Sequence, residues 1–282
     1  MKRKMGTGIL ILLFLVGLSL VLYPTVSDWW NSMHQSRAIS SYTQALENTD
    51  TALYEQIRAS AQNYNRELPR EDSRFEMTEE EKKVYMQELN LTGNGIMGVL
   101  EIPGLDVEMP IYHTTEESVL QGAVGHIEGS SLPVGGVGTH CALSGHRGLP
   151  SARLFTDLDK MDTGDVFMMH ILDETLTYQV DQVLIVLPHE VEALAIEEEK
   201  DYCTLVTCTP YGVNTHRLLV RGQRTIDAED IEEEEVFRAK AVESKWMQEY
   251  KRDVAISFAL FLAGIILLAM VRLMKRNKNG EV

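Results

Sequence analysis

Two long apolar stretches lie near the two ends of the chain. Residues 5–23 carry no charged side chain and follow a basic cluster, and residues 254–271 are uncharged and precede a basic tail. Each stretch is long enough to cross a bilayer as a helix. Because basic residues flank the terminal side of both, the positive-inside rule predicts a two-pass cell-membrane protein. The segments 1–4 and 272–282 would lie in the cytoplasm, and everything between the two helices would lie outside.

The first apolar stretch has a second interpretation, a cleaved signal peptide. The apolar core of such a peptide is usually shorter and ends at a cleavage site made of small residues. Tyr23 and Pro24 offer no such site, and Trp29 and Trp30 are typical of a membrane–water interface. These features favour a retained helix in contact with membrane lipid.

After the first stretch, apolar positions recur at helical spacing. In residues 24–68 most of them are three, four or seven positions apart, which predicts one or two amphipathic helices in an extracellular region. Two compatible roles stay open, a spacer above the membrane and helices packed on the next domain. Residues 69–81 are polar and charged, which predicts a loop followed by a helix start at Thr78.

From Gly95 onward the pattern changes to short β-like runs separated by Gly, Pro, Asn and Asp. Seven or eight short strands predict a mainly β domain, a barrel or a sandwich, over residues 94–226. The acidic run that opens residues 227–253 predicts a solvated linker. Short helices fit at 116–121 and 151–160. The expected strands are 96–102, 107–112, 139–144, 166–171, 175–187, 202–207 and 216–222.

Composition changes this picture in one respect. The net charge of −16 argues against a nucleic-acid partner, because phosphate contacts need basic patches. Both ends of the chain are basic, so the part between the two apolar stretches is more acidic still. The histidines are scattered without metal-ligand spacing, and neither a metal nor another cofactor is expected.

Three residues suggest chemistry through their positions. Cys208 ends the apolar strand TLVTC before a turn, His146 lies in the glycine-flanked turn SGHRG, and Arg217 opens the strand that returns nine residues after Cys208. A thiolate can attack a carbonyl carbon, an imidazole can move protons near neutral pH, and a guanidinium can hold a developing oxyanion. Each residue alone is a weak signal, since a cysteine in an apolar strand is usually a small buried hydrophobe.

The other cysteines have a structural interpretation. Three cysteines are too few for a disulfide-built scaffold, and an odd number leaves at least one free thiol. Cys141 and Cys203 each lie five residues before a candidate catalytic residue, on strands that could be neighbours. Because five is odd, both should point to the face opposite the candidate site. We expect reduced core cysteines in preference to a disulfide, and structural roles for His140 and His216.

Taken together, the strings GHRG, TLVTCT and NTHR occur in this order between two membrane anchors and resemble the sortases closely. The stretch from about 94 to 224 is similar to the pilin-polymerising class C sortases in particular. The resemblance implies a closed β-barrel whose active site lies in a groove. It also implies a cell-envelope cysteine transpeptidase of a Gram-positive bacterium.

The resemblance further implies a mechanism. Cys208 would cleave an LPxTG-like sorting signal and form a thioacyl enzyme, and an acceptor lysine of the next pilin subunit would resolve it, which polymerises pili. His146 would protonate the leaving amine and deprotonate the incoming one. Arg217 would stabilise the oxyanion and orient the substrate. Thr207, just before Cys208, is a further candidate for substrate binding or orientation through its hydroxyl.

One segment departs from the class C pattern. Class C sortases usually carry a lid loop with an Asp-Pro-aromatic motif before the barrel, whereas this chain has Asp72, Ser73, Arg74 and Phe75 at that place. We expect residues 69–81 to form a lid nevertheless, with Asp72 facing Arg217 and Phe75 covering the nucleophilic cysteine.

Three alternatives to the pilus polymerase stay open. A cell-wall-anchoring sortase would use a peptidoglycan amine as acceptor, and a cysteine peptidase would use water. A non-catalytic membrane scaffold would bind pilins through the same fold. The second apolar stretch and the extended region before the barrel favour the polymerase. The presence of Cys208, His146 and Arg217 argues against the scaffold.

Overall fold

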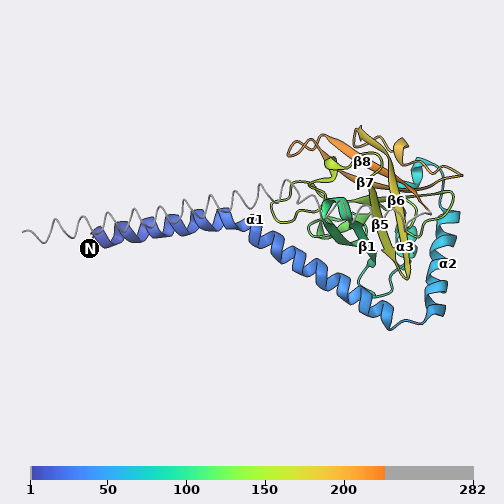
Figure 1. The fold of residues 1–282 in the computed structure, drawn as a ribbon, viewed down its shortest axis with the longest axis horizontal. Coiled ribbons are helices and arrows are strands. Elements are labelled where there is room, and N and C mark those ends of the chain that lie inside the picture. The colour runs from blue at the N-terminus through green and yellow to red at the C-terminus, as the bar shows by residue number, and fades with distance from the viewer. Residues whose placement is uncertain (1, 226–282) are drawn as a thin grey trace, which may run out of the picture. The chain divides into compact units, whose positions relative to one another are not determined.

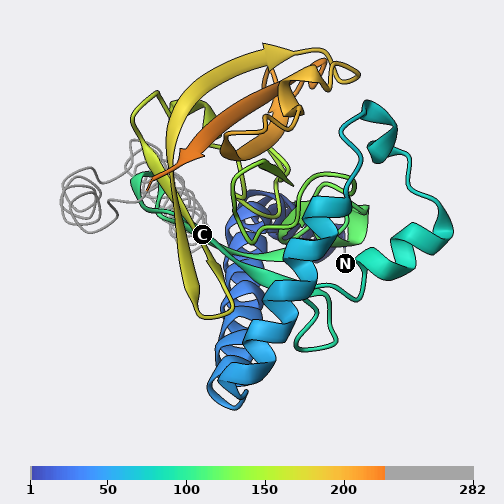
Figure 2. The same ribbon diagram turned by 90° about the vertical axis from the view of Figure 1, so that its right-hand side faces the viewer.

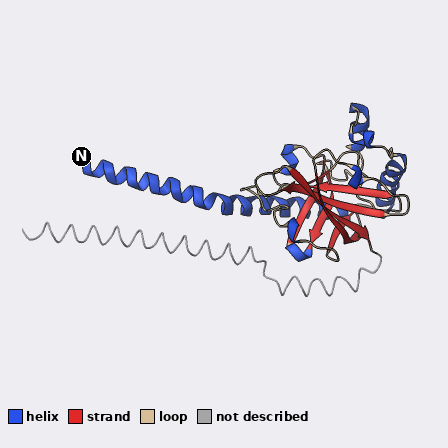
Figure 3. Ribbon diagram, turned by 90° about the horizontal axis from the view of Figure 1, so that it is seen from above, coloured by secondary structure: helices blue, strands red, loops and turns tan. Residues whose placement is uncertain are grey.

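The computed structural model describes residues 2–225, with side chains from Ile11 onward. In this part of the chain eight strands close into one barrel in the order β1-β2-β3-β4-β7-β8-β6-β5 (Figures 1 and 3). The strands are β1 (Ile96–Ile102), β2 (Val107–His113), β3 (Val124–His126), β4 (Thr139–Ser144), β5 (Val166–Ile171), β6 (Glu174–Val186), β7 (Asp201–Thr209) and β8 (His216–Arg224).

The barrel confirms the predicted mainly β fold. Strands β1, β4 and β5 have the predicted bounds, and β2, β6, β7 and β8 differ from them by at most two residues at either end. The three-residue strand β3 was not predicted, because it is too short to show an alternating pattern. The helix expected over 151–160 is wrong, since only the 3-10 turn η3 (Leu158–Lys160) forms there.

Four α-helices precede or interrupt the barrel within residues 2–225. They are α1 (Lys2–Glu47), α2 (Thr51–Glu67), α3 (Glu79–Tyr85) and α4 (Glu117–Leu120), accompanied by the 3-10 turns η1 (Asp72–Phe75), η2 (Pro103–Leu105) and η4 (Glu192–Leu194). Helix α3 begins where the sequence predicts, because Thr78 and Glu81 form a reciprocal capping box.

Helix α1 contains the first apolar stretch and continues beyond it without a break in the helix. It is long and apolar enough to cross a membrane, a property that it shares with signal sequences. The predicted second span, with the linker 227–253 and the tail after it, lies outside the described residues.

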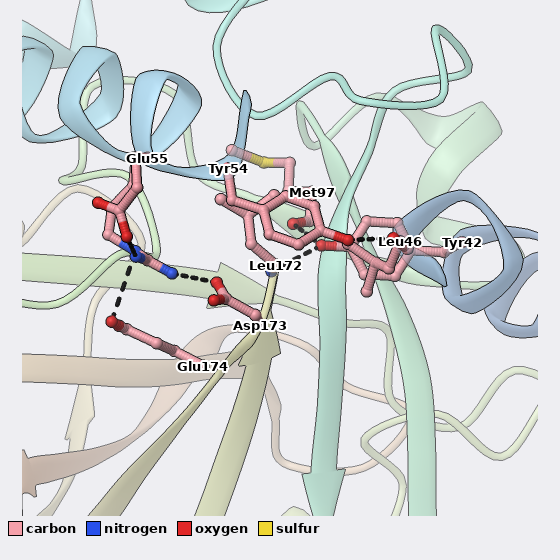
Figure 4. A network of polar contacts seen from close by, with 9 residues as sticks. Tyr42, Leu46, Tyr54, Glu55, Met97, Leu172, Asp173 and Glu174 are labelled. Carbon is pink, nitrogen blue, oxygen red and sulfur yellow. Dashed lines mark hydrogen bonds and ion pairs between the residues drawn. The ribbon is translucent and has the colours of Figure 1, made fainter. Parts of the chain in front are cut away.

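The corner between α1 and α2 is fixed to the barrel by polar contacts (Figure 4). The Tyr42 hydroxyl donates to the Met97 carbonyl at 3.2 Å and accepts from the Leu172 amide at 2.9 Å. Tyr42 is 1% exposed, and burial raises its pKa to about 12. Nearby, Arg58 of α2 pairs with Asp173 and lies 3.5 Å from Glu174. The predicted extracellular helices therefore pack on the barrel (Figure 2).

Candidate active site

The candidate site lies where β4, β7 and β8 run side by side. Strands β4 and β7 are parallel, with Ser144 opposite Val206, and β7 and β8 are antiparallel, with Cys208 opposite Arg217. His146 and Cys208 each follow the Ser144–Val206 pair by two residues. Because neighbouring strands lie about 4.8 Å apart, the register places Cys208 beside Arg217, and the turn that carries His146 begins directly after Ser144 on the other side of β7.

The site is on the outer face of the barrel wall. Along β7, Cys203 and Leu205 belong to the barrel core, so the alternating positions Val206 and Cys208 point away from it. Cys141 and Cys203 lie directly opposite each other in the core, both buried and free. The prediction that these two cysteines point to the face opposite the candidate nucleophile is therefore confirmed.

The backbone before His146 is held tightly against β7. The Gly145 amide donates to the Val206 carbonyl at 3.1 Å, and the Thr207 hydroxyl donates to the Gly145 carbonyl at 2.7 Å. Thr207 is 2% exposed. Its hydroxyl thus fixes the turn that carries His146, which agrees with the orienting role, one of the two roles expected for Thr207.

The two glycines of the GHRG string are required by close packing. A Cβ atom on Gly145 would come within 2.7 Å of the Phe155 ring. Gly148 has φ +76°, and a Cβ there would lie 2.8 Å from the Tyr211 ring. A side chain at Gly145 would displace the turn, because the Phe155 ring is buried, whereas at Gly148 the positive φ itself favours glycine.

Glu117 contacts His146 and was missed by the sequence reasoning. Its Oε2 lies 3.3 Å from Nε2 of His146. Hydrogen bonds from Gln121 and His146 hold the pKa of the Glu117 carboxyl below its usual value, so the group is an anionic acceptor at neutral pH. A neutral imidazole then carries its proton on Nε2 and keeps Nδ1 as the basic nitrogen. Nothing in the local sequence distinguishes Glu117 from its acidic neighbour Glu116.

Arg147 ties the same turn to the end of β7. Its guanidinium lies 2.5 Å from the Asp159 carboxylate, donates to the Thr209 hydroxyl at 3.3 Å, and stands 6.0 Å from the Tyr211 ring centroid. The side chain is 9% exposed. Arg147 therefore holds the turn against the end of β7, and its charge is neutralised by Asp159.

Arg217 differs from Arg147 because no ion pair to it is found among residues 2–225. It is half-buried, and its Nη1 donates to the carbonyls of His216 at 3.2 Å and Asn214 at 3.4 Å. These contacts leave further guanidinium donors available beside Cys208. An anionic oxygen that develops at this place would meet a charged donor of fixed position.

The expected lid residues lie elsewhere. Asp72 is 3.9 Å from the guanidinium of Arg74, and that guanidinium stands 4.4 Å above the Phe75 ring. Arg74 is buried and donates to the Leu194 carbonyl at 2.9 Å, in η4. The structure thus pairs Asp72 and Phe75 with Arg74, which differs from the expected placement at Arg217 and Cys208.

The segment around η1 is in fact near the opposite end of β7. Arg70 donates to the Gly138 carbonyl at 2.8 Å, and the Gly138 amide donates to the Lys200 carbonyl at 2.7 Å. Lys200 precedes β7 and Cys208 is its penultimate residue, a separation of roughly 25 Å at about 3.3 Å per residue. Figure 1 shows the loop between β7 and β8 on the side that α1 approaches, away from α2 and α3.

The remaining histidines near the site have structural partners. His140 is buried, with Nδ1 2.8 Å from the Ala195 carbonyl and Nε2 2.7 Å from the Thr204 hydroxyl. Burial lowers its pKa to about 4. His216 contacts the hydroxyl of Thr215 at 2.9 Å. In the described part of the chain, no three or more His, Cys, Asp or Glu side chains are arranged to hold a metal.

Comparison with known proteins bears directly on this site. The family model of the sortase domain matches residues 100–225. Sortase C1 from Streptococcus agalactiae is 50% identical, and the alignment covers 68% of this chain and 99% of that protein with a TM-score of 0.65. The chain belongs to the sortase family. Sortases are cysteine transpeptidases, and Cys208 is a free, half-buried cysteine in the matched domain.

Two further sortases are informative. Sortase C from Streptococcus pneumoniae is 42% identical, with coverage of 67% of this chain and 96% of that one and a TM-score of 0.60. Sortase D from Bacillus subtilis is 28% identical over 130 residues, which are 45% of this chain and 63% of that protein. The solved relatives place this sortase with class C, and the match to sortase D covers less than two thirds of that relative's length.

Proposed function

We propose that this sortase is a membrane-anchored transpeptidase that joins pilin subunits. Cys208 attacks the carbonyl carbon of an LPxTG-like sorting signal, and the carbon–nitrogen bond of the signal breaks to give a thioacyl enzyme. A lysine amine of the next pilin then attacks the thioester, which releases the Cys208 thiolate and forms an isopeptide bond. The observation that carries this proposal is the pairing of Cys208 with Arg217, together with the turn of His146 that is hydrogen-bonded to β7 through Gly145.

Each side chain has one role in the proposed reaction. His146 donates a proton to the leaving amine and takes one from the incoming lysine, and Glu117 orients its imidazole through Nε2. Arg217 stabilises the oxyanion of the tetrahedral intermediates. Thr207 and Arg147 hold the turn and the strand end in place.

The choice of a pilin lysine as acceptor rests on the relatives. The Streptococcus pneumoniae sortase C structure is described in terms of pilin substrate specificity. Anchoring through α1, with the barrel outside the cell, agrees with the apolar stretch of that helix. A two-pass topology with residues 254–271 as the second span is part of the proposal.

The test is a transfer assay in which a pilin lysine, a peptidoglycan-type amine and water are compared as acceptors in separate incubations. The purified chain is incubated with an LPxTG-type peptide and a pilin domain that carries the acceptor lysine, a peptidoglycan-type amine, or buffer alone. A peptide-to-lysine isopeptide product, absent with Cys208→Ala, supports the polymerase. Products only with the peptidoglycan amine would indicate a cell-wall-anchoring sortase, and hydrolysis alone despite excess acceptor would indicate a peptidase.

A further inference from the structure

Helix α1 presents three polar side chains to the barrel just beyond its apolar stretch. Asp28, Asn31 and Gln35 follow one another at spacings of three and four residues, so they share one face of the helix. All three are half-buried, whereas their neighbours Trp29, Trp30 and others on the opposite face are exposed. This polar face precedes the apolar face with which α1 packs on β1 and β2.

Each of these side chains contacts a backbone group of the barrel. Asp28 accepts a hydrogen bond from the Arg153 amide at 2.9 Å, and the Asn31 side-chain amide donates to the Ser151 carbonyl at 2.8 Å. The Gln35 side-chain amide donates to the Gly122 carbonyl at 2.8 Å. Because backbone groups are the partners, the contacts fix the path of two loops.

The first of these loops carries His146. Ser151 and Arg153 lie between His146 and Phe155, and the Phe155 amide donates to the His146 carbonyl at 3.0 Å. Arg153 also binds the buried Asp157 through its side chain at 2.7 Å. A shift of the backbone at residues 151–153 is therefore passed to His146 through a closed hydrogen-bonded loop.

The second contacted segment leads to the same imidazole. Gly122 follows the single turn of α4, and its amide donates to the Val119 carbonyl at 3.2 Å. Glu117, in the first turn of α4, contacts Nε2 of His146 at 3.3 Å. A four-residue helix is too short to hold its own position, so its attachment to Gln35 bears on where the Glu117 carboxylate lies.

We propose that Asp28, Asn31 and Gln35 are positioning residues for His146, and that the helix anchored in the membrane thereby forms part of the support of the active site. The inference rests on the proposed function, in which His146 moves the protons. Catalysis depends on placement of the imidazole, since a displacement of about 1 Å can lower a rate by roughly 100-fold. The loss of α1 contacts should therefore slow turnover and leave the folded barrel intact.

The test uses the full chain in lipid nanodiscs and matched substitutions. Asp28→Ala removes the acceptor for the Arg153 amide, whereas Asp28→Asn keeps an acceptor oxygen at the same place. Asn31→Asp keeps the size of the side chain and replaces its donor with a second acceptor facing the Ser151 carbonyl. Ser36→Ala, at an exposed position of the same helix, is the control.

Steady-state transfer of an LPxTG-type peptide and hydrogen exchange of the Arg153 amide are measured for each variant, and Tm is measured beside them as the control for folding. For Asp28→Ala and Asn31→Asp combined, we expect kcat to fall roughly ten-fold with KM within about two-fold and an unchanged Tm. The Arg153 amide should exchange faster in Asp28→Ala. Asp28→Asn and Ser36→Ala should match the wild type in both quantities.

Two results would overturn the inference. One is a wild-type kcat together with wild-type exchange at Arg153 in Asp28→Ala. The other is a loss of kcat in Asp28→Ala that is proportional to the loss of folded protein and is as large in Asp28→Asn. Failure of the proposed function is distinct from both, because the wild type would then form no thioacyl product. The exchange of Arg153 would still report whether α1 holds the loop.

Discussion

Cys208 and Arg217 lie directly opposite each other across the antiparallel pair of β7 and β8, at the end of the pair that opens into the connecting loop. The pairing places a half-buried thiol beside a guanidinium that no carboxylate neutralises among the described residues. The turn that carries His146 lies on the other side of β7.

Substitution of Arg217 tests the oxyanion role. We expect Arg217→Ala to lower kcat by about 100-fold or more, because a directed charged donor is lost at the site of developing charge. Arg217→Lys should recover only part of the rate, since an ammonium lacks the planar fork of donors. Steady-state transfer kinetics check both variants. A rise in KM of similar size with an unchanged kcat would instead show that Arg217 acts in substrate binding.

Alkylation of thiols tests the placement of the η1 segment. Only Cys208 should react with iodoacetamide in the folded chain, because Cys141 and Cys203 are 2% and 0% exposed. Phe75→Ala should leave the rate of this reaction unchanged, since Phe75 packs under Arg74 far from Cys208. Peptide mapping by mass spectrometry gives the rate for each cysteine. A faster reaction in Phe75→Ala would show that the segment covers the site.

The Tyr42 hydroxyl should contribute measurably to stability. Tyr42→Phe leaves the Leu172 amide and the Met97 carbonyl without their buried partner, which costs about 1–3 kcal/mol. Chemical denaturation measures the difference. Tyr64→Phe is the control, because the half-buried Tyr64 hydroxyl has no hydrogen bond in the structure of residues 2–225. Equal losses of unfolding free energy in the two variants would show that the hydrogen bonds of the Tyr42 hydroxyl do not stabilise the fold.

Buried His140 should make the fold sensitive to acid. Its pKa is lowered by burial from 6.5 to about 4, so the unfolded chain takes up the proton first as the pH falls. The stability that the neutral ring provides is present above pH 6.5 and is lost between pH 6.5 and 4, by at most about 3 kcal/mol.

The comparison of wild type with His140→Gln isolates this contribution. Burial also lowers the pKa of His113, so part of the slope should remain in the variant. Unfolding free energies at pH 7, 6, 5 and 4 provide the measurement. Identical slopes for the two proteins would show that His140 is not the group that titrates.

The strands were predictable because they are bounded by turn residues and carry apolar side chains, whereas the closed barrel was predicted from the resemblance to sortases. Three short motifs at strand ends led to Cys208, His146 and Arg217, whose catalytic roles stay a prediction. The sequence could not show that α1 runs on from the apolar stretch to Glu47, nor that Asp28 and Asn31 contact the loop after β4. Such contacts join polar residues more than 100 positions apart and leave no local pattern.

The expected lid shows a second reason for failure. Its position before the barrel was inferred from the resemblance. Its contacts, however, depend on the hydrogen-bond acceptors that surround the Arg74 guanidinium. Arg74 donates to backbone carbonyls of Arg70, Glu71 and Leu194, which binds the segment to η4. Because every residue has a backbone carbonyl, the sequence does not show which carbonyls an arginine side chain will bind.

The most direct test of the central claim is the acyl state of Cys208. The purified chain is mixed with an LPxTG-type peptide without acceptor, quenched in acid, digested and mapped by mass spectrometry. The account predicts an acyl adduct on the peptide that contains Cys208, labile to hydroxylamine, present in Cys203→Ala and absent in Cys208→Ala. An unmodified Cys208 in the wild type, or an adduct on another residue, would contradict it.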